Sequence, residues 1–319
     1  MKCKKCAQRA SIQMRQHHLA LCKDHFLDWF VEQTQRFIRK YQMMQPQQRL
    51  LLAVSGGKDS LTAWDVLHRL GYAVDGLYIH LGIEGEDHYS DQSEALCRQF
   101  AQQRGLHLQV VRVQDECGLA VPELARSTHR GHHRPCAVCG LVKRHLFNQA
   151  ATAGGYEVLV TGHNLDDEAA VLFGNTLIWS TDLLRRQSPV LEETPGFPRK
   201  VKPLCRFYER ETAAYAILRG IEYIEQECLH VEGSTLLEHK AVLNQMEAGR
   251  PGMKQQFYLK FLQARQGGLL APAPIQAADP SRCPRCGQPT TANGLCTYCR
   301  LMDKSRPWDG LDNNANSGV

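Results

Sequence analysis

The sequence contains no run of about eighteen apolar residues, the length that a membrane-spanning helix requires. Its opening residues, which include Lys2 and Cys3, lack the charged and then apolar pattern of a secretory signal. Glu and Lys show no excess over other polar residues, so a thermophile signature is also missing. The absent membrane and secretion signals predict a cytoplasmic protein without a membrane partner.

Charge is nearly balanced, since 38 Lys and Arg against 33 Asp and Glu leave a net charge of +5. The basic residues are clustered, however, at positions 2–9, 126–134, 185–186 and 199–202. Such clusters suit a polyanionic partner, although scattered basic residues on a solvated surface are the simpler alternative for any one of them.

Cysteine is abundant: the chain has 13, and eight of them form four Cys-x-x-Cys pairs. In a cytoplasmic chain this usage indicates metal or redox chemistry and not disulfides. Two sets have the spacing of closed, four-ligand structural zinc sites. Their predicted ligands are Cys3, Cys6, Cys22 and His25 near the start, with His17 or His18 as competitors, and Cys283, Cys286, Cys296 and Cys299 near the end.

The pair Cys136 and Cys139 has no second pair nearby and opens a predicted helix, a position that lowers a thiol pKa. Cys228 is the natural third partner. Three thiolates would hold a 4Fe-4S cluster by three irons and leave the fourth iron open to an exogenous sulfur atom. A thioredoxin-like dithiol and a persulfide-bearing cysteine without a cluster are the alternatives.

Residues 54–60 read Val-Ser-Gly-Gly-Lys-Asp-Ser, between an apolar run at 50–53 and a helical pattern at 61–67. This order of strand, glycine turn and helix predicts a phosphate cradle. It is not a Walker A loop, because Gly-x-x-x-x-Gly-Lys-Ser/Thr is absent. Lys58 is expected to neutralise charge on a leaving pyrophosphate, and Asp59 to bind Mg²⁺. The alternative is a glycine turn with no ligand.

A second strand-to-helix junction reads Thr-Gly-His-Asn-Leu-Asp-Asp-Glu at 161–168. Gly162 would allow close backbone approach, and Asp166 or Asp167 would hold Mg²⁺ or position a substrate base. In the competing interpretation, Asp166 only caps the helix.

The middle of the chain alternates between strand and helix patterns, which predicts a parallel α/β sheet with ligands at the carboxyl ends of its strands. Predicted strands are 50–53, 73–79, 107–113 and 157–161, and predicted helices are 61–67, 90–104, 142–152 and 166–177. A helical extension is expected at 209–226 and 236–265. The expected domains are a zinc knuckle at 1–28, the α/β domain with its extension at 29–270, a second zinc knuckle at 271–307 after a linker at 271–280, and a disordered tail at 308–319.

The order of these motifs along the chain resembles that of the TtuA-type tRNA 2-thiouridine synthetases. The run at 55–60 is similar to their PP-loop, and the three-cysteine set and the two zinc knuckles occur in the same order. The resemblance implies ATP-dependent adenylation of the O2 oxygen of a tRNA uridine, followed by attack of sulfur on the same carbon. It also implies a ubiquitin-like carrier with a C-terminal thiocarboxylate as the sulfur donor, and free sulfide from a desulfurase is the alternative.

Carried onto this chain, the resemblance implies that Cys136, Cys139 and Cys228 ligate the cluster and that Lys58 and Asp59 act at the ATP phosphates. Lys143 and Arg144 are further expected contacts. Together with Cys136 and Cys228, Lys58 and Asp59 form the expected catalytic set. The expected ATP-binding residues are Ala53, Val54, Ser55, Gly56, Gly57, Lys58, Asp59, Ser60, Gly162, His163, Asp166 and Asp167.

Two rival functions remain open at this point. A TtcA-type 2-thiocytidine synthetase also has a PP-loop and a cluster but pairs two Cys-x-x-Cys motifs, whereas this middle region offers only Cys228 as a third ligand. A zinc-dependent RNA-binding protein without catalysis would explain the knuckles and basic clusters. The sequence does not choose between the T-loop and the wobble uridine, and homodimerisation is common in the family but not required by any residue.

Overall fold

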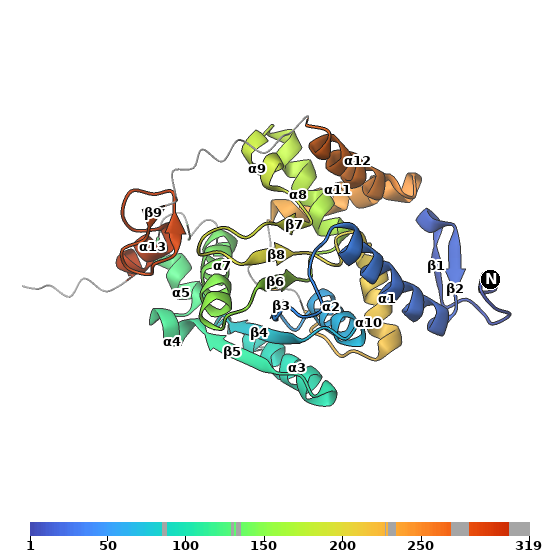
Figure 1. Cartoon of the computed structure of the whole chain (residues 1–319), viewed down its shortest axis with the longest axis horizontal. Coiled ribbons are helices and arrows are strands. Elements are labelled where there is room, and N and C mark those ends of the chain that lie inside the picture. Colours follow the sequence, from blue (N-terminus) through green and yellow to red (C-terminus); the bar gives the residue numbers. More distant parts are fainter. Residues whose placement is uncertain are drawn as a thin grey trace, which may run out of the picture.

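The computed structural model describes residues 1–84, 88–128, 131, 135–226, 228, 234–268 and 281–305. At its centre is a six-stranded sheet with strands of one direction except at one edge (Figure 1). The β7 strand pairs antiparallel to β8, and the other pairs are parallel. In spatial order the strands are β5 (Leu108–Arg112), β4 (Val74–His80), β3 (Leu50–Val54), β6 (Val158–Thr161), β8 (Arg199–Val201) and β7 (Val190–Leu191).

Side chains of β3 alternate between the two faces of the sheet, as a strand requires. Leu50, Leu52 and Val54 join one hydrophobic cluster. Leu51, between them, joins the other with Leu159 of β6. Both faces are therefore covered, which explains why the central strands are almost wholly apolar. The predicted α/β class and its four parallel strands are confirmed.

Helices from distant parts of the chain cover the two faces (Figure 1). The cluster around Leu50 includes residues of α1 (Lys23–Lys40), α2 (Lys58–Arg69), α3 (Tyr89–Arg104) and α10 (Glu209–Arg219). The cluster around Leu51 includes residues of α4 (Val113–Cys117), α5 (Val121–Arg126) and α7 (Pro135–Ala153). The helix predicted at 142–152 is α7, which begins seven residues earlier than predicted, at Pro135.

The helical extension consists of α11 (Thr235–Gly249) and α12 (Met253–Gln266), which both pack on α8 (Leu165–Leu177). The short helix α9 (Thr181–Arg186) follows α8. The helical pattern expected at 236–265 is confirmed but interrupted, since Pro251 and Gly252 separate the two helices and Gly252 takes φ +99°. The pattern expected at 209–226 is too long, since α10 ends at Gly220 with φ +65°.

Two small modules lie at opposite ends of the molecule (Figure 1). The first contains β1 (Ile12–Met14), the 3-10 helix η1 (Arg15–His17) and β2 (Leu19–Leu21), and α1 follows directly and continues past residue 28. The second contains β9 (Ser281–Arg282), β10 (Pro289–Thr290) and α13 (Thr297–Ser305). The expected linker at 271–280 and tail at 308–319 lie outside the described residues.

A buried carboxylate joins three of the helices on the first face. Asp65 of α2 is 1% exposed. It accepts hydrogen bonds from Arg104 of α3 at 2.9 Å and from Tyr215 and Arg219 of α10 at 2.7 and 3.0 Å. Within the parts of the chain that the structure describes, no helix is both long and apolar enough to span a bilayer.

Candidate functional site

The glycine turn after β3 is fixed in place by its neighbours. Gly56 takes φ +73°, and a Cβ there would lie 2.9 Å from the Ser93 carbonyl oxygen, so glycine is required on both counts. The Ser60 hydroxyl accepts from the Ser55 backbone N–H at 3.1 Å and donates to the Gly57 carbonyl at 3.0 Å. The turn therefore presents the N-terminus of α2, whose free N–H groups favour an anion, as a preorganised phosphate cradle.

The junction between β6 and α8 lies against this cradle. A Cβ on Gly162 would lie 2.8 Å from the backbone nitrogen of Ser60. Asn164 caps α8: its side chain accepts from the Asp167 N–H at 3.1 Å, and Asp167 accepts from the Asn164 N–H at 3.0 Å. The Asn164 amide also donates to Asp59 at 3.2 Å. The two strand-to-helix motifs expected from the sequence thus form one site.

Asp166 does not cap α8, so the interpretation that it only caps the helix is wrong: Asn164 already holds that position. Asp166 instead forms a buried ion pair with Lys254 of α12, with the two side chains only 6% and 4% exposed. Its other oxygen accepts from the Glu209 backbone N–H at 2.9 Å. Asp166 therefore ties the helical extension and the start of α10 to the site. His163 is exposed, and its Nδ1 lies 2.8 Å from the Thr161 hydroxyl.

Two lysines share one carboxylate beside the cradle. Lys58 Nζ lies 2.7 Å from Glu209 and 3.2 Å from Asp59. Lys240 Nζ of α11 lies 3.2 Å from the other oxygen of Glu209 and 2.6 Å from Asp167. Sequence patterns did not reveal Glu209, Lys240 and Lys254, because these residues lie far from both motifs and no local pattern marks them.

The pKa values of the two acids that contact Lys58 are shifted in opposite directions. Burial raises the pKa of Asp59, and the nearby charge of Asp167 adds to this, although Lys58 opposes it. Burial would also raise the pKa of Glu209, but hydrogen bonds and charge from Lys58 and Lys240 lower it below its ordinary value. Glu209 is therefore ionised, and a polyphosphate could replace it as the anionic partner of Lys58.

A cavity of about 450 Å³ opens at the cradle. The segment 223–226 forms one wall, anchored by the Ile224 N–H donating to the Gly56 carbonyl at 2.9 Å. Tyr89 of α3 forms another part of the lining. The remaining lining residues are Ser55, Gly57, Lys58, Asp59 and Ser60. Ala53 and Val54 are the last residues of β3, directly before the turn.

The three cysteines come from two segments, and their sulfurs do not all lie within 4.8 Å of one another as the ligand atoms of the sets at the two ends of the chain do. Cys136 is exposed in the first turn of α7, Cys139 is half-buried one turn later, and Cys228 is half-buried after the cavity wall at 223–226. Burial raises the pKa of Cys139, and the charges of Cys228 and Cys136 raise it further. The expected lowering of the thiol pKa at the helix start is therefore wrong for Cys139, because burial outweighs the helix dipole and the neighbouring Lys143.

Tyr89 connects the cysteines with the cradle. Burial raises the pKa of its phenol, and the charges of Cys228 and Cys139 raise it further, so both thiols act on a residue that also lines the cavity. Lys143, expected at the nucleotide, lies close enough to Cys139 for its charge to lower the pKa of that thiol against the effect of burial. Arg144 lies beside Gly140 on the same helix, where a Cβ on that glycine would be 3.3 Å from its guanidinium.

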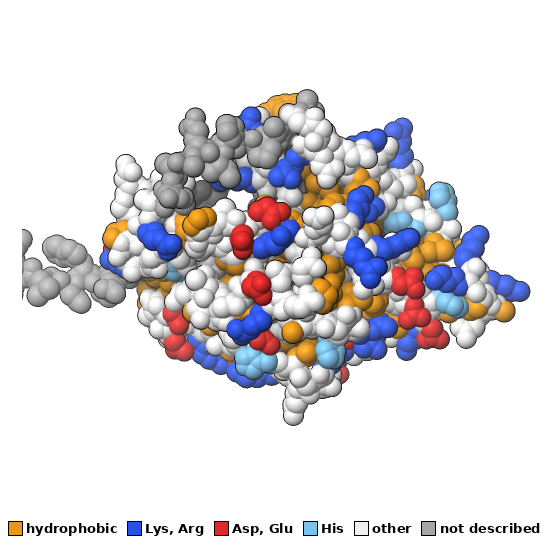
Figure 2. All heavy atoms as spheres, viewed as in Figure 1, with side chains coloured by type: hydrophobic (Ala, Val, Ile, Leu, Met, Phe, Trp, Pro, Cys, Tyr) orange, Lys and Arg blue, Asp and Glu red, His pale blue; other side chains and the backbone are white. Residues whose placement is uncertain are grey.

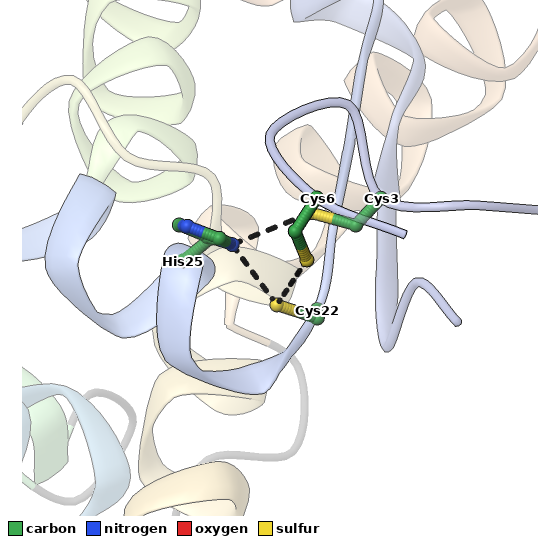
Figure 3. A group of neighbouring side chains, drawn as sticks. All are labelled: Cys3, Cys6, Cys22 and His25. Atoms are coloured by element: carbon green, nitrogen blue, oxygen red, sulfur yellow. Dashed lines mark hydrogen bonds between the residues drawn. The ribbon is translucent and has the colours of Figure 1, made fainter. Parts of the chain in front are cut away.

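The N-terminal cysteines and His25 converge on one point (Figure 3). The sulfurs of Cys6 and Cys22 are 3.8 Å apart, and His25 Nδ1 is 3.6 Å from the Cys3 sulfur. A tetrahedral ion with 2.3 Å bonds to sulfur requires edges of about 3.8 Å between sulfurs, so the set fits zinc. His17, an expected competitor, instead pairs with Glu211 at 3.1 Å.

The C-terminal set has the same geometry and contacts the helix that carries Cys136. Its four ligand atoms also converge, with the sulfurs of Cys286 and Cys296 3.8 Å apart. Tyr298 of α13 stacks on His145 of α7 with ring centroids 3.5 Å apart and planes 9° apart. Gln288 donates to the His145 carbonyl at 3.0 Å. The module that carries this second set therefore packs against α7.

Comparison with known proteins agrees with this architecture. A sequence profile of the PP-loop domain matches residues 29–229, about two thirds of the chain. The chain therefore belongs to the PP-loop family. A profile described as the N-terminal LIM domain of the 2-thiouridine synthetase TtuA matches residues 2–27.

Full-length relatives narrow the family further. The tRNA-5-methyluridine(54) 2-sulfurtransferase of Thermus thermophilus is 48% identical over 95% of this chain and 91% of its own. That of Pyrococcus horikoshii is 38% identical over 94% of this chain and 93% of its own. The chain thus belongs to the family of these tRNA 2-sulfurtransferases.

A solved structure has the same fold. The U34-tRNA thiolase NcsA from Methanococcus maripaludis, described with its [4Fe-4S] cluster, superimposes with a TM-score of 0.78 at 22% identity. The match covers 95% of this chain and 96% of that one. At this identity the likeness concerns the fold alone.

Proposed function

We propose that this protein is an ATP-dependent tRNA sulfurtransferase that forms 2-thiouridine. One observation carries the proposal: Tyr89 lines the cavity at the phosphate cradle, and the charges of Cys139 and Cys228 raise its pKa, so two of the three cysteines lie near this cavity. An activated substrate and a sulfur-handling group could therefore act on the same base. Family membership supports this assignment.

In the proposed reaction, the O2 oxygen of uracil attacks the α-phosphorus of ATP and pyrophosphate leaves. A sulfur nucleophile then adds to C2, and O2 departs with AMP, so one sulfur replaces one oxygen. Lys58 exchanges Glu209 for the departing pyrophosphate, and the N-terminus of α2 stabilises the phosphate oxygens. Asp59, held by Asn164, is placed to bind Mg²⁺ on the phosphates.

Cys136, Cys139 and Cys228 would hold a 4Fe-4S cluster, which when bound supplies an open iron for an exogenous sulfur atom. The converging sets at the two ends of the chain would each hold one structural Zn²⁺, because all four tetrahedral positions are filled by protein. The identity to enzymes named for position 54 supports the T-loop 5-methyluridine as the target. A thiocarboxylated carrier as the sulfur donor, a homodimer and a cytoplasmic location remain predictions.

Nucleoside mass spectrometry of host tRNA tests the proposal. Cells with the intact gene are compared with cells that lack it, carry Cys136→Ser, or carry Cys117→Ser, a control outside the three-cysteine set. We expect a 2-thiouridine derivative to disappear without the gene and in Cys136→Ser but to persist in Cys117→Ser, and fragment mapping to place it in the T-loop. Loss of 2-thiocytidine would assign the rival reaction, and unchanged tRNA would favour a non-catalytic RNA-binding protein.

A further inference from the structure

A groove of about 820 Å³ lies between the N-terminal module, α1 and the start of α12. Four cations line it: Arg36, Arg39 and Lys40 from the end of α1, and Arg206 from the segment before α10. Among the described residues that line it, none is acidic. Figure 2 shows Lys and Arg side chains gathered over the part of the surface that α1 occupies in Figure 1.

These four cations are not compensated by neighbouring carboxylates. No ion pair between described residues includes any of them, although Glu32 lies one turn before Arg36 on α1. Asp28 of α1 lies 3.7 Å from Arg69, and Glu211 of α10 pairs with His17 at 3.1 Å. Four uncompensated charges in one groove concentrate anions there.

Aromatic side chains form the floor of the same groove. Trp29 is half-buried at its edge, and Phe37 is buried beneath Arg206, whose guanidinium lies 4.5 Å from the ring centroid. In the part of the chain that the structure describes, the buried Nε of Arg206 has no hydrogen-bond partner. Cations beside aromatic faces are typical of surfaces that bind unpaired segments of nucleic acid.

The groove leads towards the phosphate cradle. It shares Gln255 with a second cavity of about 500 Å³, whose lining includes Arg250 and Lys260. That cavity shares Pro251 with a third, of about 380 Å³, which Asp166 and Glu209 line. Separate hollows with further cations therefore lie between the groove and Glu209, the partner of Lys58.

We infer that this groove binds the phosphate backbone of the tRNA, away from the reacting base. The inference rests on the proposed function, because only an RNA substrate makes a path from groove to cradle useful. An acidic protein, such as a sulfur carrier, would match the charge alone. The partly exposed ring of Trp29 and the cations in the neighbouring hollows favour RNA.

The test is tRNA binding by a triple variant, measured by fluorescence anisotropy at 50 to 300 mM salt. It carries Arg36→Gln, Arg39→Gln and Lys40→Gln. The matched control removes three exposed cations outside the basic clusters, with Arg98→Gln, Arg282→Gln and Arg300→Gln. ATP binding and the urea unfolding midpoint are measured for both variants, and thiolation is followed at varied tRNA concentration.

We expect the groove variant to bind tRNA at least tenfold more weakly, with a salt slope lower by about 1 for each phosphate-binding cation removed, or about 3 in all. Its KM for tRNA rises, while kcat at saturating tRNA and ATP affinity stay unchanged. Affinity and slope within twofold of the wild type would overturn the inference, as would an equal loss in the control. A change only in the dependence on a sulfur carrier would assign the groove to that protein instead.

The two proposals fail separately. If the wild-type protein forms no 2-thiouridine, but the groove variant binds tRNA more weakly than the wild type does, the proposed reaction is refuted and the tRNA-binding groove is supported. If the wild-type protein thiolates tRNA, but the groove variant binds tRNA as tightly as the wild type does, the proposed reaction is supported and the tRNA-binding groove is refuted.

Discussion

Replacement of Gly162 by alanine tests whether the two strand-to-helix junctions must touch for the site to work. The new Cβ would lie 2.8 Å from the Ser60 nitrogen and 2.9 Å from the Asp59 carbonyl carbon. Both are backbone atoms in the first turn of α2, so no flexible side chain can move aside. The φ of Gly162 lies outside the left-handed region, so alanine strains no dihedral angle and the close contact alone is tested.

The size of the effect follows from that contact. The atoms must separate by roughly 0.7 Å to reach an ordinary carbon contact distance. Overpacking of this kind costs about 1–3 kcal/mol of unfolding free energy. The displaced atoms belong to the phosphate cradle, and misplacing catalytic groups by about 1 Å lowers rates about 100-fold. We therefore expect a modest loss of stability and a loss of thiolation activity of up to about 100-fold.

The assay pairs urea unfolding with calorimetric ATP binding and anaerobic tRNA thiolation. Gly249→Ala is the control, because no heavy atom lies within 4 Å of a Cβ at that residue, the last of α11. The control should keep full activity and gain up to about 1 kcal/mol, since alanine is the better helix former. If Gly162→Ala binds ATP and thiolates tRNA within twofold of the wild type, the junctions do not need this contact and the reasoning is refuted.

Three further predictions concern the surrounding framework. Asp65→Ala should lower the unfolding free energy by about 1–3 kcal/mol in urea, because the buried Tyr215 hydroxyl and the partly exposed Arg104 and Arg219 lose their buried acceptor. Asp182→Ala, at a side chain that is 80% exposed, should cost less than about 1 kcal/mol. Burial would raise the pKa of Asp65, but hydrogen bonds from Arg219 and Tyr215 lower it below its ordinary value. The ionised Asp65 carboxylate therefore stabilises the folded state above about pH 4, and this contribution is lost as the pH falls through the folded-state pKa. Asp65→Asn should therefore flatten the fall in thermal stability between pH 5 and 2, and an unchanged slope would contradict this. Cys299→Ser should reduce bound zinc from two ions per chain to one by plasma mass spectrometry, and two retained ions would exclude the C-terminal set as a site.

Local patterns predicted the parts of this site that are continuous in sequence. The glycine turn at 55–57, the second junction at 161–164 and the zinc spacings each carry their geometry within a few residues. The grouping of Cys228 with Cys136 and Cys139 stays a prediction, because the two segments that carry them are joined by no local pattern. The relationships that the sequence did reveal are short-range.

The ion pairs around the cradle had no such signal. Glu209, Lys240 and Lys254 reach the site from three helices, and each looks like an ordinary charged residue of a helix in isolation. The groove cations at 36, 39 and 40 were missed for a similar reason, because Arg206 and the aromatic floor join them only through tertiary packing. Residues brought together by folding across long sequence separations carry no local periodicity from which they could be predicted.

The packing of α1 has a consequence for the order of events during synthesis. Phe30 stacks on Phe207 with ring centroids 3.8 Å apart. About 180 residues separate the two rings in the chain, so at ribosomal rates Phe207 emerges roughly 10 to 40 s after Phe30. The N-terminal ligands can capture a metal ion during that interval, but the apolar side of α1 stays uncovered until α10 is made. A nascent chain is therefore most exposed to chaperones and proteases while its first module can already bind a metal ion but α1 still lacks the residues that cover its apolar side.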